Sequence, residues 1–229
     1  MSRPLAIAHR GASGREVENS LAAFRAAAGL GADAVELDVH ATADGVLVVH
    51  HDEMIGRHHL AHSSFAEARS LTLANGEQIP TLDEALAAIL PRMGAFVEVK
   101  ALGPRWDERL FAAIEGTGSP DRIAVHSFDH RIIHRLGEKR PQLRRGVLSA
   151  SYPVHPARMM EDADALALWQ QADLIDEALV AAVHATGGAV YAWTVDEPAQ
   201  MGRLLALGVD GLCSNHPDRA RKAIDSLPQ

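Results

Sequence analysis

The sequence lacks the features that bind small secreted proteins together or hold proteins in a membrane. A single cysteine, Cys213, among 229 residues excludes an internal disulfide and fits a reducing compartment. The first apolar run, residues 5–8, is too short for the core of a signal peptide. The longest uncharged stretch, residues 178–195, is interrupted by Gly187-Gly188, which predicts a helix end followed by a strand and not a membrane span. We therefore expect a cytoplasmic protein with no stable membrane insertion.

Positive charge is also scarce. The formal net charge of -8 argues against nucleic acid or an anionic membrane surface as the main partner. A small anionic substrate remains compatible with this charge, because a few local basic groups outweigh a diffuse negative balance. The apolar fraction of 47% is ample for one large core, and the length suits a single α/β barrel.

Strand-like and helix-like segments alternate about eight times along the chain. Apolar runs predict strands near residues 5–8, 35–39, 95–100, 122–126, 145–148, 165–168, 189–195 and 209–213. Helical spacing and capping residues predict helices near residues 21–28, 82–89, 107–115, 129–137, 157–162, 176–186, 198–207 and from about 217. This alternation predicts a (β/α)8 TIM barrel, residues 1–229 forming one domain, with a short hairpin or insertion after the second strand. A doubly wound open sheet is the alternative; it needs fewer strands, and no glycine-rich fingerprint follows the first one.

Two stretches give weak signals. Residues 53–78 contain little beyond a short helix near 65–71, and residues 149–171 are ambiguous around the predicted helix and strand. The spacing of His58, His59 and His62 could bind a metal, but no carboxylate or cysteine framework accompanies it, which favours a polar surface segment. We interpret the remaining isolated histidines as structural or surface residues: His126, His130, His134, His155 and His184.

The most informative stretch is residues 34–52, AVELDVHATADGVLVVHHD. Its first half reads as a buried strand in which Glu36 and Asp38, two residues apart, face the same side. Paired carboxylates on a buried strand repel each other and are costly to desolvate, so a bound cation is the simplest compensation. The stretch then turns through a second apolar run, residues 46–49, into His50-His51-Asp52. This pattern predicts a metal-assisted acid/base site.

Other polar residues stand near the ends of other predicted strands. His9 and Arg10 follow the first strand, Glu98 and Lys100 close the third, and Trp193 lies late in the seventh. The C-terminal ends of barrel strands meet at one face, where such enzymes place their active sites. We therefore expect these side chains to converge.

Together, these residues suit the hydrolysis of a phosphate ester. Glu36, Asp38 and Glu98 would form an all-oxygen site for one divalent cation, Mg2+, Ca2+ or Mn2+, whereas zinc would normally require histidine or thiolate ligands. The basic side chains after the first strand and on the third suit non-bridging phosphate oxygens. His9 and His51 remain to move protons, one activating the attacking hydroxyl and the other protonating the departing alkoxide.

At this point the chain resembles the glycerophosphodiester phosphodiesterases. The matching motifs are, in order, His9-Arg10-Gly11, Glu18-Asn19-Ser20, Gly31-Ala32-Asp33 with Glu36 and Asp38, Asp44-Gly45, His51-Asp52, Pro80-Thr81-Leu82, Glu98-Val99-Lys100, Trp193-Thr194-Val195 and Gly208-Val209-Asp210-Gly211. The resemblance implies a barrel of this type, a divalent metal on the three carboxylates and catalytic roles for the two imidazoles. It also implies phosphate contacts from Arg10 and Lys100 and a pocket wall at Trp193.

The resemblance also decides between two neighbouring histidines. Consecutive residues on an extended strand point to opposite sides, so His50 and His51 cannot both face the metal, and both faces of this strand are apolar. The family pattern of histidine followed by aspartate selects His51, with Asp52 orienting its ring. One departure is Ser214-Asn215-His216-Pro217, which replaces the common Thr-Asp-x-Pro.

The expected activity is hydrolysis of a glycerophosphodiester to glycerol 3-phosphate and an alcohol. Two alternatives stay open. One is a lysophospholipase D-type enzyme that accepts an acylated glycerol, and the other is a non-catalytic phosphate-ester or metal-binding barrel. The sequence does not give the leaving alcohol or the oligomeric state.

Overall fold

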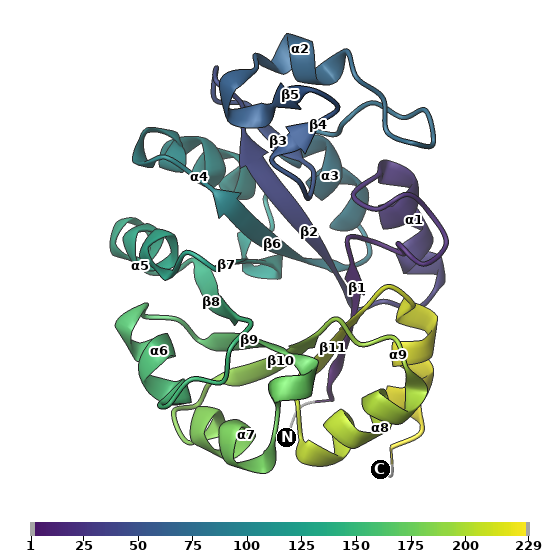
Figure 1. Cartoon of the computed structure of the whole chain (residues 1–229), viewed down its shortest axis with the longest axis vertical. Helices are drawn as coiled ribbons and strands as arrows, with labels where there is room; N and C mark the ends of the chain where they lie inside the picture. The colour runs from purple at the N-terminus through teal and green to yellow at the C-terminus, as the bar shows by residue number, and fades with distance from the viewer. Residues whose placement is uncertain (1–2, 228–229) are drawn as a thin grey trace.

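The computed structural model describes residues 3–227 and forms a closed barrel of eight parallel strands (Figure 1). In ring order the strands are β1 (Leu5–His9), β2 (Ala34–Ala41), β6 (Gly94–Ala101), β7 (Ile123–Ser127), β8 (Arg144–Ser149), β9 (Ala167–Gln171), β10 (Ala189–Trp193) and β11 (Gly211–Ser214). The ring closes because β1 pairs in parallel with both β2 and β11, at Ile7↔Ala34 and Ile7↔Cys213. The predicted barrel is thus confirmed, and the open sheet is excluded.

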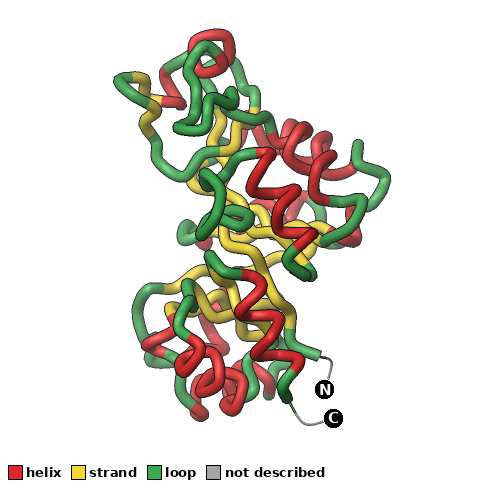
Figure 2. Tube along the Cα trace, turned by 90° about the vertical axis from the view of Figure 1, so that its right-hand side faces the viewer, coloured by secondary structure: helices red, strands yellow, loops and turns green. Residues whose placement is uncertain are grey.

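The segment after each of these strands contributes an α-helix to the layer that packs outside the barrel (Figure 2). These helices are α1 (Leu21–Gly29), α3 (Leu82–Ile89), α4 (Asp107–Glu115), α5 (His130–Lys139), α6 (Pro156–Asp162), α7 (Glu177–His184), α8 (Pro198–Leu207) and α9 (Pro217–Asp225). The expected caps are present: Ser20 Oγ accepts the N–H of Ala23, and Thr81 and Glu84 form a reciprocal capping box. No helix within residues 3–227 is both long and apolar enough to cross a membrane.

Alternation along the strands divides their side chains between two cores. Outward residues pack under the helices, while Phe96, Trp169 and Tyr191 meet inside the barrel with ring centroids 4.9–5.2 Å apart. This aromatic layer fills the interior below the C-terminal ends of the strands. Polar side chains one step further along the inward faces must therefore open toward the barrel mouth.

The segment after β2 builds a small unit of its own. It comprises β3 (Leu47–Val49), which pairs antiparallel with β2, the hairpin β4 (Met54–Ile55) and β5 (His58–His59), and α2 (Phe65–Arg69). The predicted hairpin strand and short helix are present, whereas the β4–β5 hairpin was not predicted. Its apolar residues form a separate cluster of Val48, Ile55, Leu60, Ala68 and Ile79.

The ambiguous stretch contains a helix and a strand, as expected, but the strand begins later than predicted. β9 starts at Ala167, because its pairing with β8 runs from Gly146↔Ala167 to Ser149↔Gln170. Leu166, just before β9, is apolar but 67% exposed and lies outside the strand. Its apolar side chain explains why the sequence predicts an earlier start for this strand. Residues 3–227 also contain four short 3-10 helices: Leu60–His62, Pro104–Trp106, Pro120–Arg122 and Ala172–Leu174.

Candidate active site

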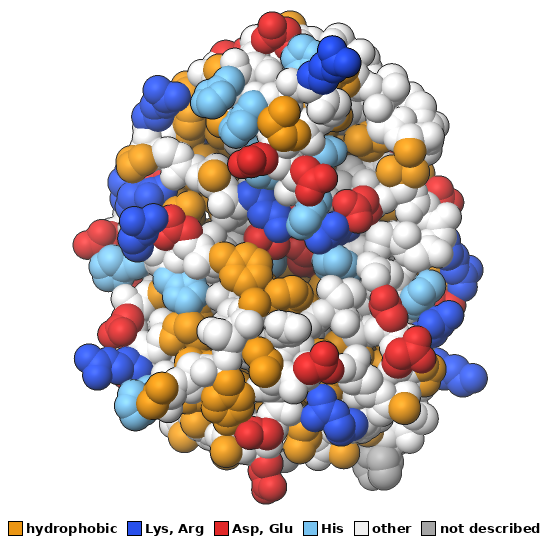
Figure 3. All heavy atoms as spheres, in the orientation of Figure 1, with side chains coloured by type: hydrophobic (Ala, Val, Ile, Leu, Met, Phe, Trp, Pro, Cys, Tyr) orange, Lys and Arg blue, Asp and Glu red, His pale blue; other side chains and the backbone are white. Residues whose placement is uncertain are grey.

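A small cavity of about 90 Å³ lies at the barrel mouth. Every predicted site residue except Asp38 lines it directly, namely His9, Arg10, Glu36, His51, Glu98, Lys100 and Trp193. Acidic, basic and histidine side chains accordingly gather near the middle of this face of the molecule (Figure 3). The predicted convergence at the strand ends is therefore what the structure shows.

Glu36 and Glu98 are buried carboxyl groups, and having both of them ionised at the same time is unfavourable. Burial, followed by the charges of Asp38 and Glu98, raises the pKa of Glu36 well above its ordinary value. Burial and the charge of Asp38 raise the pKa of Glu98 to about 7. A divalent cation would favour the ionised form of both, and all-carboxylate oxygens are suitable donors for it.

Asp38 lies in a different environment. Its Oδ1 is 2.9 Å from Lys100 Nζ, while its Oδ2 is 3.2 Å from Arg10 Nε and accepts a 2.8 Å hydrogen bond from Asn19 Nδ2. Burial raises the pKa of Asp38, but Lys100 and Arg10 outweigh it and bring that pKa to about 2. Asp38 is thus a fixed negative charge that holds the two basic side chains; its predicted role as a metal ligand stays a prediction. The hydrogen bond from Asn19 to Asp38 was not predicted from the sequence.

The two basic side chains are partly exposed at the cavity. Lys100 Nζ also lies 2.8 Å from Glu98 Oε1; its contacts to the two carboxylates are ion pairs without hydrogen-bond geometry. Burial lowers the pKa of Lys100, but Asp38 and Glu98 raise it overall, so the ammonium stays charged. Arg10 Nη1 reaches Glu18 at 2.9 Å. Both groups therefore present positive charge to the cavity.

The orientation of His9 follows from a chain of side-chain contacts. Asn215 Nδ2 donates to Asp196 Oδ2 at 2.7 Å, which turns the amide oxygen of Asn215 toward His9 Nδ1, also at 2.7 Å. His9 must then carry its proton on Nδ1, leaving Nε2 free to accept one. Burial and the charge of Arg10 lower the pKa of His9, which keeps the ring neutral near pH 7. Asn215, part of the departure from the family motif, supplies this acceptor, and Asp196 was not predicted.

His51 and His50 differ as the family pattern suggested. His51 lines the cavity, and its Nδ1 lies 2.8 Å from Asp52 Oδ1. His50 is not among the lining residues, and its Nδ1 lies 3.0 Å from the backbone oxygen of Asp52. The expected alternation of side chains along an extended strand does not apply to His50 and His51, because β3 ends at Val49.

An apolar wall borders the cavity beside these groups. The rings of Phe128 and Trp193 meet edge to face, with centroids 5.5 Å apart. The Trp193 Nε1–H is buried and has no acceptor among the described residues. Trp193 thus offers both an apolar face and a hydrogen-bond donor, and Phe128 is a wall residue that the sequence did not single out.

His126, interpreted from sequence as structural or surface, is buried at the same mouth. Its Nε2 lies 3.8 Å from Glu36 Oε1, and ligand atoms of Glu36, Glu98 and His126 all lie within 4.8 Å of one another. Burial lowers the pKa of His126 to about 3, so the ring is neutral. Strand parity could have found it, because a residue two positions after the inward Ala124 must face the mouth.

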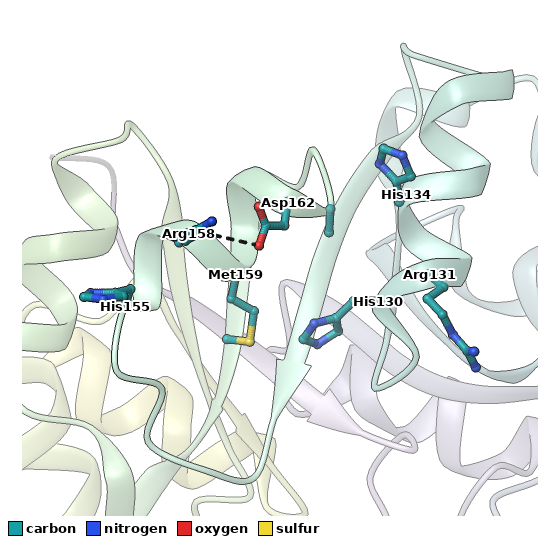
Figure 4. Close-up of a pocket in the computed structure, with 8 residues that line it drawn as sticks. His130, Arg131, His134, His155, Arg158, Met159 and Asp162 are labelled. Atoms are coloured by element: carbon teal, nitrogen blue, oxygen red, sulfur yellow. Dashed lines mark ion pairs between the residues drawn. The ribbon is translucent and has the colours of Figure 1, made fainter.

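A second cavity, of about 490 Å³, is an open groove between α5 and α6, and three histidines line it: His130, His134 and His155. Figure 4 shows their rings spread along the groove. His130 Nε2 lies 2.9 Å from the backbone oxygen of Leu148, and His134 lies 3.9 Å from Glu138. These histidines lie on the outside of the barrel, as expected for surface residues.

The comparisons with known proteins agree with this geometry. A model of the glycerophosphoryl diester phosphodiesterase family matches residues 9–219. The chain belongs to this family. Its relatives include a glycerophosphodiester phosphodiesterase of Caldanaerobacter subterraneus subsp. tengcongensis, 33% identical over 94% of this chain and 96% of the relative. A probable glycerophosphodiester phosphodiesterase 2 of Mycobacterium tuberculosis is 34% identical over 96% of this chain and 90% of the relative.

Solved structures of family members share the fold. A glycerophosphodiester phosphodiesterase from Parabacteroides distasonis has a TM-score of 0.89, with 25% identity and 98% of each chain covered. A phosphodiesterase from Oleispira antarctica, in complex with the product sn-glycerol-3-phosphate, has a TM-score of 0.87, with 27% identity and 97% of each chain covered. By its family, the protein is an enzyme of the phosphoric diester hydrolase class.

Proposed function

We propose that this enzyme hydrolyses glycerophosphodiesters to glycerol 3-phosphate and an alcohol with one divalent cation and the imidazoles of His9 and His51. The observation that supports this most is the make-up of the mouth cavity. Buried carboxylates, two basic side chains and two differently oriented histidines meet there within one family fold. Together they can bind, polarise and protonate a phosphodiester.

Glu36 and Glu98 would hold the cation, with Asp38 as the predicted third carboxylate beside them. When bound, the cation would supply Lewis-acid stabilisation of the charge that develops on the phosphate oxygens. Glu98 Oε1 is buried and makes no hydrogen bond in the described part of the chain; its neighbour is Lys100 Nζ at 2.8 Å, so a bound cation would share this carboxylate with the ammonium.

Lys100 and Arg10 would bind the non-bridging oxygens of the phosphate. Both are anchored by Asp38 and lie partly open to the cavity. Because Asp38 already holds these two basic side chains in place, they need little reorganisation when the substrate binds. The Trp193 indole N–H is a further donor for an oxygen of the substrate.

The two histidines are suited to different halves of the proton transfer. His9 is neutral, with Nδ1–H fixed on an uncharged amide, so its Nε2 would accept the proton of the attacking hydroxyl. The carboxylate of Asp52 holds the ring of His51 from its Nδ1 side, at 2.8 Å, which leaves Nε2 for the departing oxygen. We therefore assign His9 as the general base and His51 as the general acid for the departing alkoxide.

Exposed apolar residues near the mouth favour a second candidate, a lysophospholipase D-type activity on acylated substrates. Phe128 is 48% exposed and Tyr152 45% exposed in the segments that follow β7 and β8, and Val154, two residues after Tyr152, is 88% exposed. Such a rim could contact an acyl chain.

Choline release tests both proposals. We expect the cation-loaded protein to release choline from glycerophosphocholine faster than from its acylated counterpart, lysophosphatidylcholine. A preference for the acylated substrate would favour the second candidate, and no hydrolysis of either substrate or of glycerophosphodiesters of other alcohols would indicate a non-catalytic barrel.

We further propose that residues 1–229 form one domain and that the protein works in the cytoplasm on a small-molecule substrate. The family match spans most of the chain, and the single cysteine is a buried free thiol, as suits a reducing compartment.

A further inference from the structure

His126 is a buried imidazole for which the proposed proton transfers have no role. It is 1% exposed, and its Nδ1 has no hydrogen-bond partner within residues 3–227. An unpaired buried polar group is destabilising, so packing alone does not account for a histidine at this position. Its ring also reaches the mouth cavity, where it lies beside the carboxylates.

We infer that His126 supplies a nitrogen ligand to the cation held by Glu36 and Glu98, an inference that rests on the proposed function. Glu98 and His126 are register partners on the adjacent strands β6 and β7. The ligand atoms of the three residues lie within 4.8 Å of one another, and His126 Nε2 is 3.8 Å from Glu36 Oε1. Two ligands of one ion, each at roughly 2.0–2.6 Å, lie at most about 4–5 Å apart, so a single ion can reach all three.

Stacking fixes the ring in this position. The imidazole lies face to face on the indole of Trp169, with centroids 4.3 Å and planes 8° apart. Most metal-binding histidines are oriented by a hydrogen bond from their second nitrogen. Here the aromatic layer inside the barrel takes over that role, and the nitrogen nearest Glu36 is Nε2.

The nitrogen donor changes which ion the site prefers. Mg2+ and Ca2+ favour all-oxygen sites, whereas imidazole nitrogen favours first-row transition ions. We therefore expect this chain to bind Mn2+ or a later first-row ion more tightly than Mg2+ or Ca2+. His126→Gln, which places an amide oxygen near the same point, should weaken Mn2+ binding by at least about 10-fold, since loss of even a residue that only orients a ligand typically costs about 10- to 100-fold, and should affect Ca2+ much less.

Electron spin-echo spectroscopy of the Mn2+-loaded full chain gives a readout besides activity. The wild type should show nitrogen coupling from a histidine, His126→Gln should lose it, and the matched control His130→Gln, in the α5–α6 groove, should keep it. Calorimetry on the same proteins measures the change in Mn2+ and Ca2+ affinity. Absence of nitrogen coupling in the wild type, or its survival in folded His126→Gln, would overturn the inference.

If His126→Gln does not fold, the other two cavity imidazoles decide the question. Coupling that persists in the double variant His9→Asn/His51→Asn supports His126 as the ligand, and loss of coupling in this variant overturns the inference. Hydrolysis measured on the same samples separates this inference from the proposed function. Active wild type without nitrogen coupling overturns the inference alone, and a wild type that binds no cation overturns both.

Discussion

Two cavities of this molecule are each lined by three histidines, and they differ in how their side chains are held. In the mouth, His9 on β1, His126 on β7 and His51 in the loop after β3 approach a shared space that is also lined by the buried Glu36 and Glu98. In the groove between α5 and α6, the histidines lie at the start of α5, in the middle of α5 and just before α6; within residues 3–227, His130 contacts a backbone oxygen and His134 an exposed glutamate. The comparison shows that three histidines alone do not form an active site. The side chains must also converge on one space that contains buried polar groups without hydrogen-bond partners.

Removing a mouth imidazole should have the largest effect. His9→Ala and His51→Ala should each lower kcat by about 10²–10⁴-fold, the usual contribution of a general acid or base. His50→Ala is the matched control and should keep most of the activity, because His50 does not line the cavity. Steady-state kinetics on folded, cation-loaded variants measures this. The reverse ranking of His50 and His51 would contradict the assignment.

Loss of the lysine charge should have an intermediate effect. Lys100→Met removes a charged contact to phosphate worth about 1.5–3 kcal/mol, which corresponds to a loss of roughly 10- to 100-fold in kcat/KM. Lys222→Met, on α9, changes the same charge outside the mouth cavity and should leave kcat/KM unchanged. Equal losses in both variants would show that net charge, and not the position of Lys100, is responsible.

Without a divalent cation, the mouth carboxylates should make stability depend on pH. Because the folded-state pKa of Glu98 is raised to about 7 from an ordinary 4.5, its protonated form contributes stability that is complete below about pH 4.5 and is lost as pH rises through 7. The pKa of Asp38 is lowered to about 2 from 3.8, so its ionised form contributes stability that is complete above about pH 4 and is lost as pH falls through 2.

Thermal unfolding of chelated protein measures this dependence. Its free energy of unfolding should rise by on the order of 1 kcal/mol from pH 8 to pH 6. Saturating Mn2+ should reduce the slope, because the ion takes the place of the proton, and Glu98→Gln should flatten it. An equal slope in Glu98→Gln would mean that other groups cause it.

Changes in the groove should have the smallest effect. The double variant His130→Gln/His134→Gln alters exposed or half-buried side chains at the barrel exterior, where substitutions usually change stability by less than about 0.5 kcal/mol. Activity should stay within about twofold of wild type in the choline-release assay. A loss comparable to that of His51→Ala would remove the distinction between the two cavities.

The sequence allowed most of the fold and the position of the mouth to be predicted. Apolar runs located the barrel strands, and the two-residue spacing placed Glu36 and Asp38 on one face of the second strand. Local patterns were sufficient because each of these residues is positioned by its own strand.

What could not be predicted depends on contacts between distant segments. His9 meets Asn215 across 206 residues of chain, and His126 stacks on Trp169, a residue of β9. Neither contact has a signature in local periodicity. The sequence also could not predict that Asp38 differs in environment from Glu36 and Glu98. That difference arises because the Lys100 and Arg10 side chains both contact Asp38.

Phosphorus NMR of glycerophosphocholine hydrolysis tests the central claim most directly, namely that buried mouth carboxylates and a divalent cation make this protein a phosphodiesterase. Chelated wild type should form no glycerol 3-phosphate, and added Mn2+ should restore its formation. Glu36→Gln, folded and cation-treated, should be slower by about 10³-fold, because the cation contributes several kcal/mol of charge stabilisation. Undiminished hydrolysis by rigorously metal-free wild type, or wild-type rates from Glu36→Gln, would contradict the account.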